Sequence, residues 1–211
     1  MSIDANIWVV VFRYIIILYS LILHEISHGT MALILGDTTA KDMGRLSLNP
    51  LRHLDPVGSF LVPIFSYFMT GIAFGWAKPV PYNPYNLKKQ LSGAALIALA
   101  GPLANFCLAF LFAMVIRFNY LIGLSSSVVS FVSFIVLINC VWGIFNLIPI
   151  PPFDGSKILF FFTRGNKAER LLSRYSFFLL LIVIFFGYNF IFTLASIVFK
   201  LFTGIPVSLV F

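Results

Sequence analysis

The chain has 211 residues, of which 60% are hydrophobic and only 10% are charged. Ordinary soluble domains contain about 25% charged residues, so the composition excludes a soluble enzyme, a disordered chain and a nucleic-acid-binding module. It indicates a polytopic membrane protein with the lipid bilayer as its surroundings. The net charge of +7 is attributed to loops that face anionic lipid headgroups rather than to contacts with nucleic acid.

Several apolar stretches are long enough to cross a bilayer, because a helical span needs about 20 apolar residues. Four of them are clear: residues 6–35, 91–116, 127–149 and 175–199. A fifth, 57–76, contains Gly58, Pro63 and Gly71. No polar segment is long enough for a soluble domain. We therefore expect residues 1–211 to form a single membrane-embedded domain, an all-α helical bundle in which 57–76 is a re-entrant or hairpin element.

The basic residues predict which loops are cytoplasmic. They concentrate in segments 36–56, 77–90 and 154–174, whereas the loop between the second and third clear spans has only Arg117 at its border. Cytoplasmic loops carry an excess of Lys and Arg, so we expect all three segments on the cytoplasmic side. Segments 36–56 and 77–90 can share a side only if 57–76 enters and leaves the bilayer on that side.

The first span contains the sequence His24-Glu25-Ile26-Ser27-His28. Side chains at i and i+4 share one face of a helix, so His24 and His28 can bind one Zn²⁺ ion. Glu25 can take a proton from the attacking water. An ionisable residue at membrane depth is costly, which makes a chance placement a poor explanation. The pattern is that of a zinc protease and predicts one Zn²⁺ per chain.

Two histidines leave a catalytic zinc one protein ligand short, since such sites usually have three. Asp154 is the better candidate, because it follows a proline-broken stretch, and broken helix at membrane depth is tolerated where it lines a cavity or is buried in protein. A helix-capping carboxylate is the alternative for Asp154. His53 is the other candidate, and it is explained more simply as a loop residue hydrogen-bonded to Asp55. If Asp154 and the histidines share one metal, their helices run parallel, which again requires 57–76 not to cross.

Further motifs accompany these residues in order: GDTTAKDMGRLSLNPLRHLDP, GWAKPVPYNP, AGPLAN and NLIPIPPFDG. Together with HExxH they cover most of residues 24–155, and the set resembles the site-2 protease family of intramembrane zinc metalloproteases. Within that family the chain is similar to the compact branch without PDZ or CBS domains. The resemblance implies three zinc ligands, which are His24, His28 and Asp154. It also implies that Glu25 is the general base and that Asn146 holds the substrate or the developing oxyanion.

Other parts of the chain have expected roles beside this resemblance. Family members are thought to hold an unwound substrate at a strand-like element near the active site; segments 44–48 and 77–82 are candidates here, with plain loops as the alternative. Gly36 is expected to end the catalytic helix. Asn105 and Asn139 are expected to hydrogen-bond between helices rather than to take part in chemistry.

The leading hypothesis is a zinc endopeptidase that cuts transmembrane segments of substrate proteins. It would be a multi-pass protein of a prokaryotic cell membrane with its active site open to the cytoplasm; whether it forms a homo-oligomer is left open. A divalent-metal transporter would place polar ligands along a path through several spans. A catalytically inactive helix-binding protein would have lost Glu25 or a zinc ligand. A protease of the prenyl-protein type would need a Glu as its third ligand, and Glu169 lies in a basic stretch.

Overall fold

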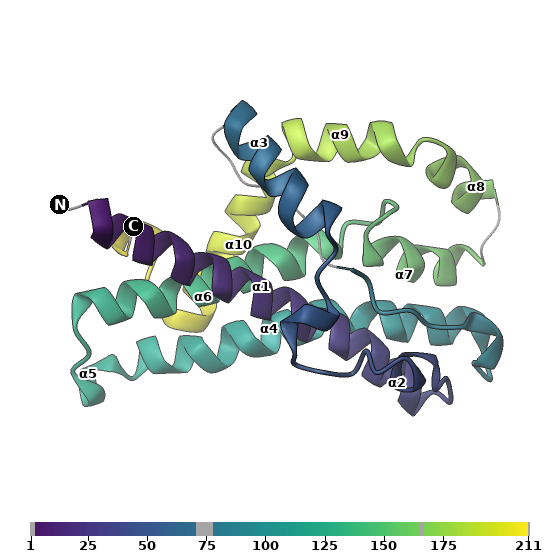
Figure 1. Cartoon of the computed structure of the whole chain (residues 1–211), viewed down its shortest axis with the longest axis horizontal. Coiled ribbons are helices and arrows are strands. Elements are labelled where there is room, and N and C mark those ends of the chain that lie inside the picture. Colours follow the sequence, from purple (N-terminus) through teal and green to yellow (C-terminus); the bar gives the residue numbers. More distant parts are fainter. Residues whose placement is uncertain (1–2, 71–77, 165–166, 211) are drawn as a thin grey trace. The chain divides into compact units, whose positions relative to one another are not determined.

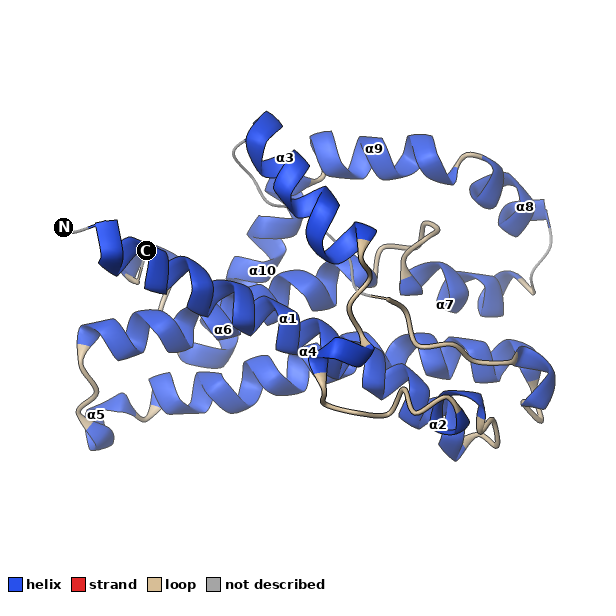
Figure 2. Ribbon diagram, viewed as in Figure 1, coloured by secondary structure: helices blue, strands red, loops and turns tan. Residues whose placement is uncertain are grey.

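The computed structural model describes residues 3–70, 78–164 and 167–210. The chain divides into two compact units, Met1–Lys88 and Lys89–Phe211, each of which is taken by itself below. Helices and irregular segments make up all of the described residues, among which there is no strand (Figure 2). The predicted all-α class is therefore confirmed, and the three longest helices are apolar enough to cross a membrane.

The first unit contains the long helix that carries the HExxH sequence, followed by short elements. They are α1 (Ile3–Ile34), α2 (Thr39–Asp42), the 3₁₀ turn η1 (Pro50–Arg52), the π-helical turn η2 (Val57–Leu61), α3 (Val62–Thr70) and the 3₁₀ turn η3 (Pro84–Asn86) (Figure 1). Helix α1 ends as expected at a glycine with left-handed backbone, since Gly36 has φ of 105°. The Gly36 N–H donates to the Leu33 carbonyl oxygen and the Asp37 N–H to that of Ala32, which satisfies the last carbonyls of the helix.

The expected re-entrant element is described over residues 57–70, as η2 followed directly by α3, while 71–77 lie outside the described residues. The two helical pieces have 5 and 9 residues, together fewer than the about 20 that a span needs. They are not among the described helices that are long and apolar enough to cross a membrane. That 57–76 stays on one side of the bilayer remains a prediction.

The second unit contains the remaining helices. They are α4 (Gln90–Arg117), α5 (Asn119–Ile122), α6 (Ser126–Asn146), α7 (Asp154–Thr163), α8 (Lys167–Arg174), α9 (Ser176–Phe186) and α10 (Tyr188–Thr203), followed by the 3₁₀ turn η4 (Val207–Leu209). Helices α4 and α6 run antiparallel and side by side, joined through α5 (Figure 1). The NLIPIPPFDG sequence runs from the last residue of α6 to the second residue of α7, so this unit positions Asn146 and Asp154.

The core of the second unit lies where α4, α6 and α10 meet. Small residues of α4, Ala109 and Ala113, pack with Cys140 of α6 and with Ala195 and Phe199 of α10. Small side chains let apolar helices approach closely, which is how membrane helices gain contact in the absence of a hydrophobic driving force between them.

A buried polar pair also joins α4 to α6. The Asn105 Nδ2 donates to the Asn139 Oδ1 over 2.9 Å, and both side chains are fully buried. This confirms the predicted interhelical hydrogen bond and fixes the register of the two helices.

The predicted span 175–199 is wrong as a single helix. The chain bends by 65° between α9 and α10, at Gly187, where an added Cβ would lie 2.5 Å from the Val183 carbonyl oxygen. Hydropathy averages over the break, because the residues on both sides of Gly187 are apolar. Helix α10 packs into the core of the second unit, whereas α9 has no buried residue among those described.

Candidate metal centre

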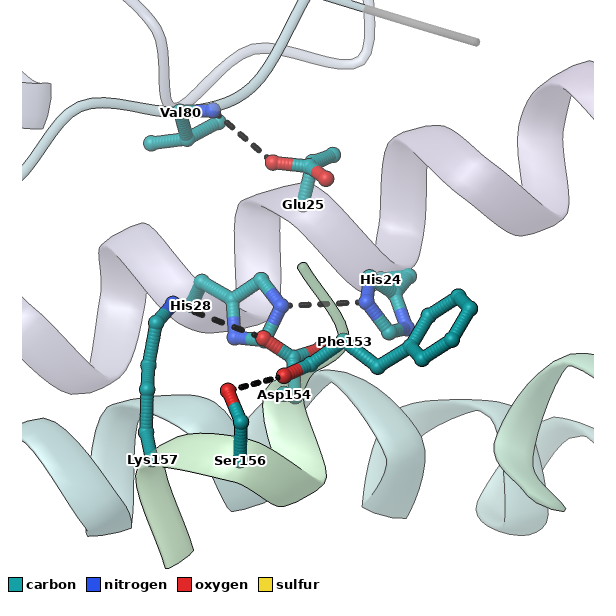
Figure 3. Close-up of polar contacts among 8 residues, drawn as sticks. All are labelled: His24, Glu25, His28, Val80, Phe153, Asp154, Ser156 and Lys157. Atoms are coloured by element: carbon teal, nitrogen blue, oxygen red, sulfur yellow. Dashed lines mark hydrogen bonds and ion pairs between the residues drawn. The ribbon is translucent and has the colours of Figure 1, made fainter. Parts of the chain in front are cut away.

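Helix α1 places His24 and His28 one turn apart, with both side chains buried. Their Nε2 atoms are 3.0 Å apart (Figure 3). Two nitrogen ligands at about 2.0–2.1 Å from one tetrahedral Zn²⁺ lie about 3.3 Å from each other, so the pair is close to the separation that a shared metal requires. The histidine pair therefore fits a zinc ion with little movement of either ring.

Glu25 belongs to the same cluster, since its carboxylate and the nitrogens of His24 and His28 include atoms that all lie within 4.8 Å of one another. Its Oε2 accepts a hydrogen bond of 2.8 Å from the backbone N–H of Val80 (Figure 3). Pro79 and Pro81 have no N–H, so Val80 is the single backbone donor of this three-residue stretch. The one backbone N–H of this stretch, that of Val80, therefore donates to the Glu25 carboxylate.

A glycine allows this segment to approach α1 so closely. A Cβ at Gly29 would lie 2.6 Å from the Leu46 Cδ2 and 2.8 Å from the Val80 Cγ1. Because Gly29, directly after His28, has no side chain, the side chains of Leu46 and Val80 can pack onto the helix. Sequence reasoning missed Gly29 and the role of Val80; the alternation of prolines around Val80 is the signal that could have pointed to its N–H.

Asp37 ties the end of α1 to the segment that carries Val80. Asp37 follows the end of α1 and is fully buried. Its carboxylate accepts hydrogen bonds from the Thr39 N–H and hydroxyl, from the Asn83 N–H at 2.8 Å and from the Asn86 Nδ2 at 2.7 Å. Burial raises the pKa of the Asp37 carboxyl, but these hydrogen bonds outweigh it and hold the pKa below its ordinary value.

Arg45 joins the two segments that were candidates for a strand-like element. Its guanidinium donates to the carbonyl oxygens of Arg52, Lys78 and Pro79. Segment 44–48 and the described part of 77–82, residues 78–82, form no ladder. The physical reason is that Pro79 and Pro81 cannot donate to a ladder, so a side chain makes the connection that backbone pairing would have made.

His53 is fully buried, and its Nε2 lies 2.7 Å from the Ser47 carbonyl oxygen. The expected hydrogen bond from His53 to Asp55 is wrong, because the Asp55 Oδ1 accepts instead from the N–H groups of Val57 and Gly58. Among the described residues, the cluster able to hold a metal consists of His24, Glu25 and His28, so His53 serves the loop structure.

Asp154 and Asn146 lie in the second unit, at the two ends of the proline-rich segment. Asp154 is the first residue of α7 and is buried, and its Oδ1 lies 3.6 Å from the Lys157 Nζ (Figure 3). Asn146 is the last residue of α6, and its Nδ2 donates to the Trp142 carbonyl oxygen over 3.1 Å. At Gly155 an added Cβ would run into the carbonyl oxygens of Leu147 and Ile148, so the turn before α7 requires a glycine.

The chain is similar to known proteins over part of its length. The family described as Peptidase family M50 matches residues 122–185. "Putative zinc metalloprotease YwhC" of Bacillus subtilis is 38% identical over 151 residues, which are 69% of this chain and 66% of the relative. "Putative zinc metalloprotease Rip2" of Mycolicibacterium smegmatis is 32% identical over 140 residues, 65% of this chain and 52% of the relative. No solved structure matches.

The matches reach beyond bacteria: "Putative zinc metalloprotease MJ0611" of Methanocaldococcus jannaschii is 38% identical over 95 residues, 44% of this chain and 48% of that protein. The chain thus spans about half to two thirds of the length of these relatives. Their names indicate Zn²⁺ as the cofactor, and the cluster of His24, Glu25 and His28 is where the described residues can hold it.

Proposed function

Because the chain belongs to peptidase family M50, the site-2 protease family, we propose that it is a zinc metalloendopeptidase that cuts transmembrane segments of other membrane proteins. The observation that carries this proposal is the placement of the Nε2 atoms of His24 and His28 3.0 Å apart, beside a carboxylate on the same helix. Helix α1 is apolar enough to span a membrane over Trp8–Ile34, which puts this cluster within a membrane helix. A hydrolytic centre at that position suits substrates that are themselves embedded in the bilayer.

We propose that His24 and His28 hold the Zn²⁺ ion together with Asp154. The buried position of Asp154 at the start of α7 supports this role, since a buried carboxylate is stabilised by a compensating positive charge. When bound, Zn²⁺ polarises a carbonyl group and lowers the pKa of a water molecule. Two imidazoles and one carboxylate form a ligand set that catalytic zinc sites commonly use.

Glu25 is the general base in this proposal. The Val80 N–H holds its Oε2, so the carboxylate has a fixed direction while the other oxygen can take a proton from the attacking water. The same group then gives the proton to the leaving amine. A carboxylate within 4.8 Å of the histidine nitrogens is close enough for this transfer and needs no place among the metal ligands.

Asn146 is proposed to position the substrate carbonyl. It ends α6, eight residues before Asp154, and the proline-rich segment between them cannot continue the helix. Its side-chain amide has a second N–H beyond the one that bonds to Trp142. That N–H can donate to a carbonyl oxygen whose negative charge grows during attack.

The proposed substrates are transmembrane helices, which must unwind locally because a helical carbonyl is already hydrogen-bonded. We propose that the site opens to the cytoplasm in a prokaryotic cell membrane, since the basic segments 36–56 and 77–90 flank the elements around Glu25. Water and the unwound substrate would then reach the cluster from the same side.

Comparative membrane proteomics tests this function. Cells that carry wild type are compared with cells that carry Glu25→Gln, which keeps the size of the side chain and removes the base. Substrates should accumulate uncleaved in the variant, and their transmembrane segments should yield new termini in wild type alone. Identical membrane proteomes in the two strains, with both proteins present at equal levels, would contradict the proposal.

A further inference from the structure

A cavity of about 490 Å³ lies in the first unit, apart from the histidine cluster. Its lining consists of Met43, Arg45, Arg52, Lys78, Pro79 and Pro81. Half of these side chains are basic and none is acidic. The cavity is therefore a concave site with three positive charges, contributed by two segments that are far apart in the sequence.

The basic residues of this cavity have no ion-pair partner within the described ranges 3–70 and 78–164. The nearest acidic residues in the sequence are engaged by other donors. The Asp42 Oδ2 accepts from the Thr38 hydroxyl at 2.7 Å, and the Asp55 Oδ1 accepts from the N–H groups of Val57 and Gly58 at 3.0 and 2.7 Å. The described part of the chain thus leaves the positive charges of the cavity uncompensated.

Arg45 makes the lack of a counter-charge costly, because its side chain is only 7% exposed. Its guanidinium donates to three carbonyl oxygens, those of Arg52, Lys78 and Pro79, while its Nε has no hydrogen-bond partner in the described structure. Carbonyl groups satisfy N–H donors but carry no net charge. A buried cation of this kind is stabilised best by an anion.

We propose that this cavity binds a phosphate group, and that an anionic phospholipid of the membrane supplies it in the cell. Arginine and lysine side chains recognise phosphate through charge-assisted hydrogen bonds. The cavity also has apolar neighbours that are open to the surroundings: Met43 is 62% exposed and Leu51 is 74% exposed. Basic residues beside exposed apolar ones are what a surface in contact with headgroups and upper acyl chains requires.

An anion bound at this site would affect the backbone segment that holds the carboxylate of Glu25. Lys78 and Pro79 line the cavity, and the next residue is Val80, whose N–H binds the Glu25 Oε2. A phosphate held between Arg52 and Lys78 would fix the backbone just before Val80. The N–H of Val80 would then exchange with solvent more slowly in the presence of the anion.

Binding is measured by native mass spectrometry on the full chain in an uncharged detergent, with added phosphatidylglycerol, phosphatidylcholine or inorganic phosphate. The test variant is Arg52→Gln with Lys78→Gln, and the control is Lys41→Gln with Lys88→Gln. All four residues are exposed and lie in the same unit, so both double variants lose the same charge. Wild type should retain phosphatidylglycerol over phosphatidylcholine, and the test variant should bind it at least about tenfold more weakly.

The control variant should bind like wild type, and thermal melting should show that both variants are folded. A second outcome is that wild type retains inorganic phosphate but not phosphatidylglycerol, and that the test variant alone loses the phosphate. This outcome would support the phosphate site and would overturn the phospholipid as its source. Hydrogen exchange of segment 78–87 should slow on addition of the retained anion. Equal weakening in both double variants, or no retention of either anion by wild type, would overturn the proposal.

Discussion

At the scale of single residues, backbone N–H groups hold two carboxylates of the first unit in place by hydrogen bonds. Glu25 accepts from Val80, and Asp37 accepts from Asn83, three residues further along. The two contacts hold one short segment against the second half of α1 and the turn that follows it. The position of the proposed base thus depends on a carboxylate that takes no part in the chemistry.

Replacing Asp37 by Asn should destabilise the first unit by about 2 kcal/mol, because the new amide turns a donor toward groups that are themselves donors. The pKa of Asp37 is lowered from its ordinary value of 3.8, so its charge stabilises the fold fully above that pH. This contribution is lost as the pH falls through the folded-state pKa. Thermal unfolding in detergent should show a large difference between wild type and variant at pH 7. An equal difference at pH 7 and below the folded-state pKa would contradict this role.

Asn146→Ala should lower turnover about 10²-fold, as the loss of one oxyanion-stabilising donor does elsewhere, and should leave the zinc content unchanged. The structural loss is small, since among the described residues the Asn146 Nδ2 bonds only to a carbonyl oxygen of its own helix. Asn105→Ala is the matched control: it breaks the buried bond to Asn139 and should lower stability instead. Cleavage assays, metal analysis and melting curves separate the two. Loss of zinc or folding in Asn146→Ala would show that the proposed role is wrong.

At the scale of elements, the sequence predicts the three longest helices and misses the bend between α9 and α10. Apolar stretches predicted three spans that the structure confirms as α1, α4 and α6 within a few residues. The bend at Gly187 was missed because hydropathy does not report backbone direction. The contact between Val80 and Glu25 was missed because a backbone N–H leaves no side-chain pattern, although HExxH itself was readable from the i, i+4 spacing of the histidines.

Gly155→Ala should distort the start of α7 and displace Asp154, since the added Cβ meets backbone carbonyl oxygens that cannot move as a flexible side chain does. Zinc content and melting temperature should both fall. Gly123→Ala is the control, because a Cβ there meets nothing within 4 Å, although its φ of 70° adds about 1 kcal/mol of backbone strain. A Gly155→Ala protein that keeps its zinc and its melting temperature would contradict the proposed need for a glycine.

At the scale of the whole molecule, the proposed function requires segments 36–56 and 77–90 to face the same side of the membrane. Their basic residues predict this from the sequence, and the short helical pieces η2 and α3 are compatible with it. Charge and hydropathy can assign sides to loops, but they cannot place one unit of the chain against the other. The proposal that Asp154 is the third zinc ligand therefore rests on motif and chemistry.

Cysteine labelling tests the topology. Lys41→Cys and Lys88→Cys are suitable because both positions are exposed, and the background carries Cys107→Ser and Cys140→Ala. A membrane-impermeant thiol reagent should label both positions from the cytoplasmic side only. Labelling of the two positions from opposite sides would show that 57–76 crosses the bilayer and would contradict the parallel helices that the sequence predicts.

In the proposed mechanism, Glu25 moves the proton while His24, His28 and Asp154 hold the metal. The direct measurement combines zinc analysis of purified Glu25→Gln and Asp154→Ala with cleavage of a model transmembrane substrate. Lys157→Ala is the control, since it removes the ion pair with Asp154 and no proposed ligand.

Glu25→Gln should keep its zinc and lose cleavage by about 10³-fold, whereas Asp154→Ala should lose zinc and activity together. Lys157→Ala should retain zinc. Full zinc content in Asp154→Ala, or near-normal cleavage by Glu25→Gln, would contradict the assigned roles.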